Sequence, residues 1–232
     1  MTGTEMHTLL LQNLQQLGGF ASKGFTESER NLHLNVGLHR YIKQRYTGNN
    51  PRKVSVEGDL KRTADLSGLV TIKDGLVSVT NTTHVANADI FTLPGYETPT
   101  PNPNKFMLYM YSQSAFHLGG GDTFKWIGNR LVAHNDLHKY IANHANDPVI
   151  EEPLVLFISG KIMIIRGPND TVTDVELFYI EQPTAITSGS SEYVGMPEHT
   201  HEEIVELTSA ILMGRTERKG YAISQEELKQ TE

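Results

Sequence analysis

The spacing of the apolar residues changes twice along the chain, from a helical period to an alternating one and back again. In residues 5–17 and 26–48, and again after residue 200, apolar side chains recur every three or four positions, as along one face of an α-helix. Between about residues 68 and 183 the apolar runs are short, rich in β-branched and aromatic residues, and separated by Gly, Pro, Asn and Asp. This order restricts the chain to an α+β fold with one continuous β section.

The second of these segments is the clearest helix before the β section. Thr26 and Glu29 stand in the spacing of a capping box, and Gly48 predicts the end of the helix. The face predicted to be buried carries Leu34, Leu38, Tyr41, Ile42 and Arg45.

Two shorter helices are predicted on either side of it. The first covers residues 5–17, ends at Gly18-Gly19, and has its apolar positions at Leu9, Leu10, Leu14 and Leu17. The other covers residues 56–65 and ends near Ser67-Gly68.

The β section is predicted to be antiparallel and to contain two hairpins. Asp74-Gly75 predicts a turn between two short strands in "GLVTIKDGLVSVT", and Ser159-Gly160 joins two apolar runs in "PLVLFISGKIMIIRG". Further strands are predicted in "ADIFTLP", in residues 106–118, beyond a turn at residues 119–121, and in "VTDVELFYIEQP". The segment "GYETPTPNPNK" holds three prolines and is predicted to be an exposed loop. A short helix is predicted to start at Asn135.

The last helix follows a polar linker, "TSGSSEYVG". Thr200 and Glu203 stand in capping-box spacing ahead of an apolar face, which holds Ile204, Leu207, Thr208 and Ile211 and is widened by Val205 and Leu212. This helix must bury its apolar face, and the N-terminal helices offer faces of the same kind. The remaining tail is charged and weakly patterned, so it is predicted to order only on a neighbouring molecule.

These elements predict an α+β architecture in which a helical bundle, formed by N- and C-terminal helices, carries an inserted antiparallel β domain. The expected divisions are N-terminal helices in residues 1–67, the β domain in 68–183 with a short helix near 135–144, a linker and returning helix in 184–215, and an arm in 216–232.

Composition narrows the possible chemistry and partners. The chain has 232 residues and no cysteine, which excludes disulfides and thiol chemistry. We expect no membrane segment, because no apolar run approaches the roughly 20 residues a spanning helix needs, and no signal peptide, because "MTGTEMHTLL" lacks its features. The formal charge of −7 is divided: Arg30 to Arg62 holds eight Lys/Arg and two Asp/Glu, whereas Asp136 to Glu206 holds three and thirteen. Such asymmetry favours head-to-tail contact between copies or an acidic surface that repels nucleic acid, although ordinary solvated faces explain it equally well.

Two groups of histidines are candidate metal ligands. His199 and His201 are two positions apart, whereas a helix brings ligands together at spacings of three or four, so they indicate a helix start rather than a metal site. His134 and His138 have the right spacing, with Asp136 between them and His144 beyond. Surface or packing roles remain the simpler interpretation for them.

Two further motifs resemble catalytic loops but lack their defining parts. "LGGGDTFKW" has no Gly-Lys-Ser/Thr ending and no following helix, and Ser159-Gly160 lacks the flanking pattern of a nucleophile elbow. We therefore expect no catalytic residue, no cofactor and no metal.

Two surfaces are candidates for binding. The basic segment "RYIKQRYTGNNPRK" has the composition for contacts to a nucleic-acid backbone, but on a helix with one apolar face such residues are usually a solvated surface. Exposed aromatic residues in the β section, with Tyr96, Tyr109, Tyr111 and Trp126 as candidates, would favour a binding module.

The order of segments resembles that of neck, or head-to-tail connector, ring proteins of tailed bacteriophages, most closely those of crAss-like phages. The resemblance spans about two thirds of the chain and depends on three segments: "NLHLNVGLHRYIKQRYTGNN" followed by "GDLKRTADLSGLV", "DTFKWIGNRLVAHNDLHKYIANHANDP", and "MPEHTHEEIVELTSAIL". The chain departs from the family after the middle segment, where a longer insert is usual, and beyond Met213.

The resemblance implies a structural protein of the virion neck without enzymatic activity. It implies a homo-oligomeric ring of twelve copies below the portal protein, contacting neighbouring neck or tail proteins, with genomic DNA passing through without sequence-specific binding. Such a protein is assembled in the host cytoplasm and contacts no membrane. The alternatives from the residues are a tail or baseplate adaptor or carbohydrate-binding β domain, and, behind these, a metal-dependent hydrolase using His134 and His138.

Overall fold

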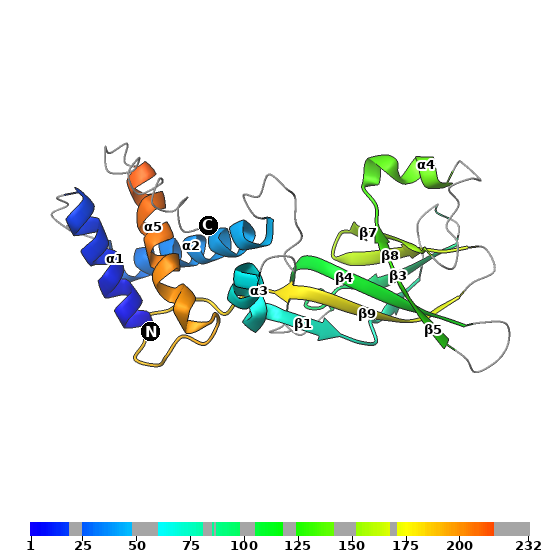
Figure 1. The fold of residues 1–232 in the computed structure, drawn as a ribbon, viewed down its shortest axis with the longest axis horizontal. Helices are drawn as coiled ribbons and strands as arrows, with labels where there is room; N and C mark the ends of the chain where they lie inside the picture. The colour runs from blue at the N-terminus through cyan, green and yellow to red at the C-terminus, as the bar shows by residue number, and fades with distance from the viewer. Residues whose placement is uncertain are drawn as a thin grey trace. The chain divides into compact units, whose positions relative to one another are not determined.

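The chain combines helices with antiparallel and mixed sheets, and its fold class is therefore α+β (Figure 1). The computed structural model describes residues 1–18, 25–47, 60–80, 85, 87–97, 105–117, 124–141, 152–167 and 171–215. It divides the chain into two compact units: Met1–Leu69 with Pro183–Glu232, here called the helical unit, and Val70–Gln182, here called the β unit.

The helical unit is built around its last helix. α5 (His201–Arg215) contacts both α1 (Gly3–Gly18) and α2 (Glu27–Thr47), as Figure 1 shows, and the short α3 (Leu60–Leu66) contacts α2. 3₁₀-turns cover Ser67–Leu69 and Glu198–Thr200. The predicted apolar face of α2 is confirmed, since all five of its residues are buried. The six predicted apolar-face residues of α5 are buried too.

The helix starts are only partly as predicted. The Thr26–Glu29 capping box is present: the Glu29 carboxylate accepts from the Thr26 amide at 2.7 Å, and the Glu29 amide donates to the Thr26 hydroxyl at 3.3 Å. The predicted capping box of α5 is wrong. The Thr200 hydroxyl donates to the Pro197 carbonyl at 2.8 Å, and the Glu203 side chain turns toward α2 and α3.

The segment between the β unit and α5 packs closely against the helices and is more than a polar linker. Asn35 of α2 bonds both backbone groups of Ile186, at 2.8 Å each, and Ile186 is fully buried. Thr2 and Glu192 form an antiparallel bridge, and Tyr193 is buried nearby. These backbone contacts bring the segment to α1 and α2 of the same unit.

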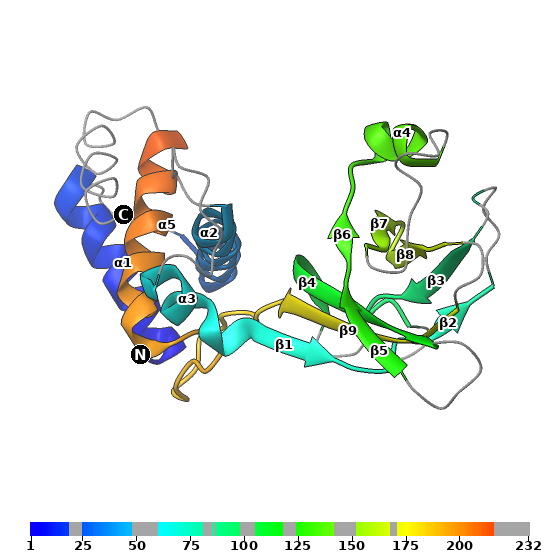
Figure 2. The ribbon, with the colours of Figure 1, turned by 45° about the vertical axis from the view of Figure 1, so that its right-hand side comes forward.

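The β unit contains two sheets (Figure 2). The four-stranded sheet has the order β1-β9-β4-β5 and is antiparallel; its strands are β1 (Val70–Lys73), β9 (Val172–Glu181), β4 (Phe106–His117) and β5 (Phe124–Gly128). The five-stranded sheet has the order β2-β3-β8-β7-β6; its strands are β2 (Ser78–Val79), β3 (Ala88–Thr92), β8 (Lys161–Ile165), β7 (Leu154–Ile158) and β6 (Arg130–Leu131).

Two apolar clusters hold the β unit together. One joins the two sheets and takes side chains from both, among them Phe116, Leu177 and Tyr179 on one side and Phe91, Val155 and Ile164 on the other. The second lies on the other face of the five-stranded sheet, where Leu137 and Tyr140 of α4 (Leu137–Ile141) pack against buried strand residues. Among the described residues of the β unit, side chains thus cover both faces of the five-stranded sheet but one face of the four-stranded sheet.

The strand pairing corrects two predictions. Asp74-Gly75 does not close a hairpin: Gly75 has a φ of 63°, but β1 pairs with β9 and β2 with β3, so the turn passes the chain from one sheet to the other. The β section is also not wholly antiparallel, because β6 pairs with β7 in parallel. A parallel pair needs a crossover connection, and α4 lies in the connection between these strands.

Other strand predictions are confirmed. β7 and β8 pair antiparallel around Ser159 and Gly160, whose φ angles of 45° and 75° are those of a two-residue hairpin turn. β4 spans Phe106–His117 and pairs with β5.

The helix predicted from Asn135 starts with a 3₁₀-turn at His134–Asp136. Ala133 occupies the N-cap position of this turn, so Asn135 is not the cap.

Some predictions concern residues outside the described part of the chain. They are the stops at Gly19 and Gly48, the start of the third helix at residues 56–59, most of the proline-rich loop, the glycine turn at 119–121, His144, and the arm at 216–232. None of the described helices has the length and apolar character needed to cross a lipid bilayer.

Candidate functional site

The predicted histidine pair at the start of α5 is divided between two different environments. His199 is exposed, and its Nε2 lies 2.9 Å from the Asp65 carboxylate of α3. His201 is buried, with Nε2 3.0 Å from the Met196 carbonyl and Nδ1 3.1 Å from the Met1 amino group. Burial lowers the pKa of His201, and the nearby ammonium group adds to this effect. Both residues lie at the start of α5, as their spacing predicted, and only the His201 ring is part of the buried packing there.

The second histidine group lies at α4. His134 and His138 are exposed. The Asp136 carboxylate forms an ion pair with Lys139, whose Nζ lies 2.5 Å from Asp136 Oδ1. Among the described residues no group of three or more His, Asp or Glu is arranged to hold a metal ion. The metal-dependent hydrolase therefore gains no support from the side chains around His134 and His138.

A buried cluster of charged side chains joins α2, α3 and α5. The Arg45 side chain is 8% exposed, and its Nη2 lies 2.5 Å from Glu203 Oε2. Its Nε lies 2.9 Å from Asp65 Oδ2, which makes an ion pair but not a hydrogen bond, because the N–H bond does not point at the oxygen. The Tyr41 hydroxyl lies 2.9 Å from the same Glu203 oxygen and 3.2 Å from Asp65 Oδ2. Lys61 approaches the other Glu203 oxygen at 3.4 Å. Cations and carboxylates thus compensate one another inside the helical unit.

The pKa shifts in this cluster follow from burial and mutual contact. Burial raises the pKa of the Tyr41 hydroxyl. For Glu203, burial acts to raise the pKa, but the hydrogen bonds from Tyr41 and Arg45 outweigh it, and the pKa is lowered. For Arg45, burial acts to lower the pKa, and contacts with Tyr41 and Glu203 reverse this. Both shifts favour the charged forms of Arg45 and Glu203, whose contact joins α2 to α5.

Sequence reasoning found only part of this cluster. It placed Tyr41 and Arg45 on the buried face of α2, but assigned Glu203 to a helix cap and gave Asp65 no role. A buried arginine demands a carboxylate partner, and this was the available signal. The sequence does not show which carboxylate approaches it.

The basic segment is also divided. Arg45 belongs to the buried cluster, whereas Arg40 and Lys43 are exposed on α2. They share the outward side of the helix with two exposed apolar residues, Leu32 at 61% and Val36 at 37%. We call these four residues the α2 outward face.

The side of the four-stranded sheet that faces away from the apolar cluster carries apolar and aromatic side chains. Register places Ile72 of β1, Phe178 of β9 and Tyr111 of β4 in one row across three strands. Ile72 is 53% exposed, Tyr111 41% and Trp126 of β5 46%. The Tyr111 and Phe178 ring centroids are 5.7 Å apart. We call these four residues, with Gln113 and Glu176 between them, the outer sheet face.

The predicted aromatic candidates do not form one group. Tyr111 and Trp126 both belong to the outer sheet face. Tyr109 points into the core, where its ring lies 5.0 Å from that of Phe157, so it was wrongly placed among exposed aromatics. Tyr96 is exposed, but it lies beside the β7–β8 turn, against Gly160, with the Lys105 ammonium 5.1 Å from its ring. A bulge between Tyr109 and Tyr111 explains why these two tyrosines point to opposite faces.

Tyr111 has a defined position on the outer sheet face. A Cβ added to Gly128 of β5 would lie 2.5 Å from the Tyr111 hydroxyl oxygen and 3.3 Å from two ring atoms, so the ring lies across the backbone of β5. Gln113 donates to Glu176 between this ring and Trp126. The face is therefore an aromatic and apolar surface with one central polar pair.

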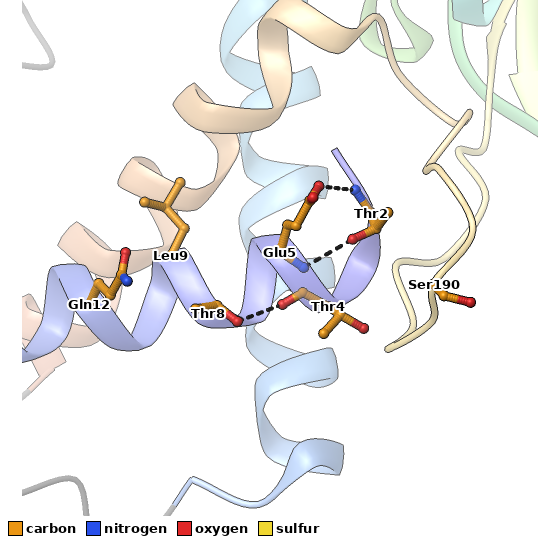
Figure 3. A pocket seen from close by; sticks show the side chains of 7 residues that line it. All are labelled: Thr2, Thr4, Glu5, Thr8, Leu9, Gln12 and Ser190. Carbon is orange, nitrogen blue, oxygen red and sulfur yellow. Dashed lines mark hydrogen bonds between the residues drawn. The ribbon is translucent and has the colours of Figure 1, made fainter.

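A pocket of about 420 Å³ lies beside the first turns of α1 (Figure 3). Hydroxyl groups of Thr2, Thr4, Thr8 and Ser190 line it together with Glu5, Leu9 and Gln12. The Glu5 carboxylate accepts from the Thr2 amide at 2.8 Å, and the Glu5 amide donates to the Thr2 hydroxyl at 3.2 Å, so these two residues form a capping box. Thr8 donates to the Thr4 carbonyl at 3.0 Å. Much of the polar lining is thus occupied by the helix itself.

The two loops that resembled catalytic motifs have different outcomes. Most of "LGGGDTFKW" lies outside the described residues. Ser159 and Gly160 form the turn between β7 and β8, so Ser159 stands on a hairpin and not at a strand-to-helix elbow.

No model of a known protein family matches the chain, and no curated protein matches it either.

Proposed function

We propose that the chain is a structural subunit of a virion neck, forming a ring of twelve copies between the portal protein and the tail of a tailed phage. The resemblance of its segment order to neck ring proteins gives the proposal its specific form. Its physical support is two surfaces that expose apolar side chains: the α2 outward face, with Leu32 and Val36 beside two cations, and the outer sheet face. Apolar surfaces of this kind on a folded chain favour contact with another protein.

In this proposal α1, α2 and α5 act as a helical bundle into which the β unit is inserted. The buried charge cluster fixes α2, α3 and α5 together, which suits a subunit that keeps its shape under load. From the acidic C-terminal half, the exposed Glu202 and Glu206 of α5 face the DNA passage, where like charge prevents adhesion. The role is structural, without catalysis.

The oligomer and the location can both be tested directly. Mass photometry of the purified chain should give a species of twelve times the 25.9 kDa of one chain, and addition of the portal protein should give a species heavier than the portal by that mass. Cryo-electron microscopy of intact particles should place the chain at the neck. Absence of the chain from purified particles, or turnover of a substrate by the isolated chain, contradicts the proposal.

A second candidate function is that of a binding module, either a tail or baseplate adaptor or a carbohydrate-binding β domain. The observation in its favour is the pair of exposed rings, Tyr111 and Trp126, on a sheet face with a central Gln113–Glu176 pair. Flat aromatic side chains with nearby hydrogen-bonding groups suit the apolar face and hydroxyls of a sugar ring. Binding on a glycan array that disappears in Trp126→Ala, with a monomeric chain in solution, would favour this candidate over the ring.

A further inference from the structure

We propose that the outer sheet face of one copy binds the α2 outward face of the next copy. This inference rests on the proposed ring and specifies which surfaces join its subunits. Each surface lies on an element whose opposite side is already buried: α2 buries Leu34, Leu38 and Ile42, and the four-stranded sheet buries Leu177 and Tyr179. The exposed sides are therefore the ones left for a partner.

The apolar parts of the two surfaces match in kind. Leu32 and Val36 are one helical turn apart and stand out from α2, with exposed fractions of 61% and 37%. The outer sheet face offers a broad surface of Ile72, Tyr111, Phe178 and Trp126 to receive them. Tyrosine and tryptophan are enriched at the centres of protein interfaces, where they bury large areas at low entropic cost.

The charges of the two surfaces are opposite. Arg40 and Lys43 lie on α2 beyond Val36, and the sequence from Leu32 to Lys43 contains no Asp or Glu. On β9, Glu176 and Asp174 alternate with inward-pointing Val175 and Leu177. The strand register aligns Phe178 and Glu176 with Ile72 of β1, with Tyr111 and Gln113 of β4 and, through Gln113, with Gly128 of β5. None of these aligned residues is Lys or Arg. This complementarity favours α2 of another copy over a second sheet, which would bring carboxylates together.

The dimensions of the two surfaces agree. From Leu32 to Lys43 the helix rises about 16 Å, at about 1.5 Å per residue. From Ile72 to Trp126 the sheet spans three strand spacings of about 4.8 Å and about four residues along the strands, which gives a diagonal of about 20 Å. A stretch of three helical turns thus fits across the sheet.

The contact is heterologous, because the two surfaces differ and lie in different units of the chain. Each copy uses one surface on each neighbour, so an open series always leaves one of each exposed. Closure into a ring removes both ends, which is the arrangement the proposed function requires.

Crosslinking of full-length chains tests which surfaces meet. The chain has no cysteine, so only engineered thiols react with a short bismaleimide. A mixture of Val36→Cys and Ile72→Cys chains should give at least about tenfold more crosslinked dimer than either chain alone. Lys139→Cys, 63% exposed on α4, is the control partner for Val36→Cys and should give only background. Equal yields with Ile72→Cys and Lys139→Cys, or dimers formed by Ile72→Cys alone, overturn the inference.

A complementation experiment separates this inference from the ring itself. Leu32→Ser and Trp126→Ala each remove one surface, and each should weaken self-association at least about thirtyfold, as expected for an interface hot spot. Their 1:1 mixture keeps one intact pair of surfaces and should form a dimer that grows no further. Rings that persist in both variants refute the docking but leave the proposed function standing. Failure of the function shows separately, as absence from particles. Loss of glycan binding in Trp126→Ala with unchanged assembly also overturns the docking.

Discussion

At the scale of single residues, the helical unit depends on charges that it buries. Arg45 is nearly inaccessible to solvent, and two carboxylates from separate helices approach it. One of them, Glu203, belongs to the acidic half of the sequence and pairs with the basic half. The charge division seen along the chain is therefore partly neutralised within one subunit. Arg62 is buried as well, and it donates to the backbone carbonyls of Arg45 and Tyr46 at the end of α2.

Asp65→Asn should lower the free energy of unfolding by about 3 kcal/mol, because it leaves the buried Arg45 with one carboxylate fewer. The change keeps the shape of the side chain, so the loss reports charge and not volume. Urea denaturation followed by circular dichroism at 222 nm measures it.

The matched control for Asp65→Asn is Glu152→Gln, which removes a carboxylate from the exposed pair with Arg130. This change should cost no more than about 0.5 kcal/mol, since exposed ion pairs contribute little. Adding Arg45→Met to Asp65→Asn should recover part of the loss. Equal effects of Asp65→Asn and Glu152→Gln would show that the buried cluster is not what holds the helices together.

At the scale of elements, patterns that act locally were predictable from the sequence and pairings between distant segments were not. The buried face of α2 and the β7–β8 hairpin at Ser159-Gly160 follow from periodicity and turn chemistry within a few residues. The partner of β1 does not, because Val70–Lys73 pairs with a strand more than a hundred residues later. Asp74-Gly75 correctly predicted a turn, but not that the strands on its two sides belong to different sheets.

The same distinction applies to the outer sheet face and the buried cluster. The sequence predicted Tyr111 and Trp126 as exposed aromatic residues of strands. It did not predict the bulge that turns Tyr109 inward and Tyr111 outward. Bulge positions leave little trace in the residue pattern. Likewise, Glu203 matched a capping box in the sequence, and only the approach of α2 gave its carboxylate a better partner.

The crossing of α2 and α5 supplies a prediction at this scale. Gly37 faces Thr208, and a Cβ added at Gly37 would overlap the Thr208 hydroxyl and lie 3.4 Å from its Cα. Gly37→Ala should therefore cost about 1–3 kcal/mol despite the better helix propensity of alanine. Thermal unfolding at 222 nm checks this. Gly189→Ala, where nothing lies within 4 Å of the added Cβ, should stay within about 0.5 kcal/mol. A stabilised Gly37→Ala would mean that the helices cross with more space between them.

At the scale of the whole molecule, the two units carry different reporters. Most helical residues belong to the helical unit, whereas the only tryptophan, Trp126, belongs to the β unit. Circular dichroism at 222 nm and tryptophan fluorescence therefore follow different parts of the chain. This separation makes it possible to ask which unit responds to a change of conditions.

The helical unit should lose stability first in mild acid. Burial lowers the pKa values of His7 and His201 from 6.5. Below pH 6.5 the unfolded chain therefore binds more protons at these two histidines than the folded chain does, which favours unfolding. Their contribution is intact above pH 6.5 and is lost as the pH falls toward the lowered values, by up to about 1.4 kcal/mol per pH unit for each group. Glu203, with its pKa below 4.5, adds a further loss in stronger acid.

Chemical denaturation between pH 7.5 and 4.5 measures this difference. The 222 nm midpoint should fall more steeply with acidity than the Trp126 fluorescence midpoint. His7→Gln keeps a donor for the Asn31 side-chain oxygen, 2.9 Å from His7 Nε2, and should flatten the dependence. His134→Gln, at an exposed position in the β unit, should leave it unchanged. If both midpoints fall together, or fluorescence responds first, the buried histidines do not set the acid response.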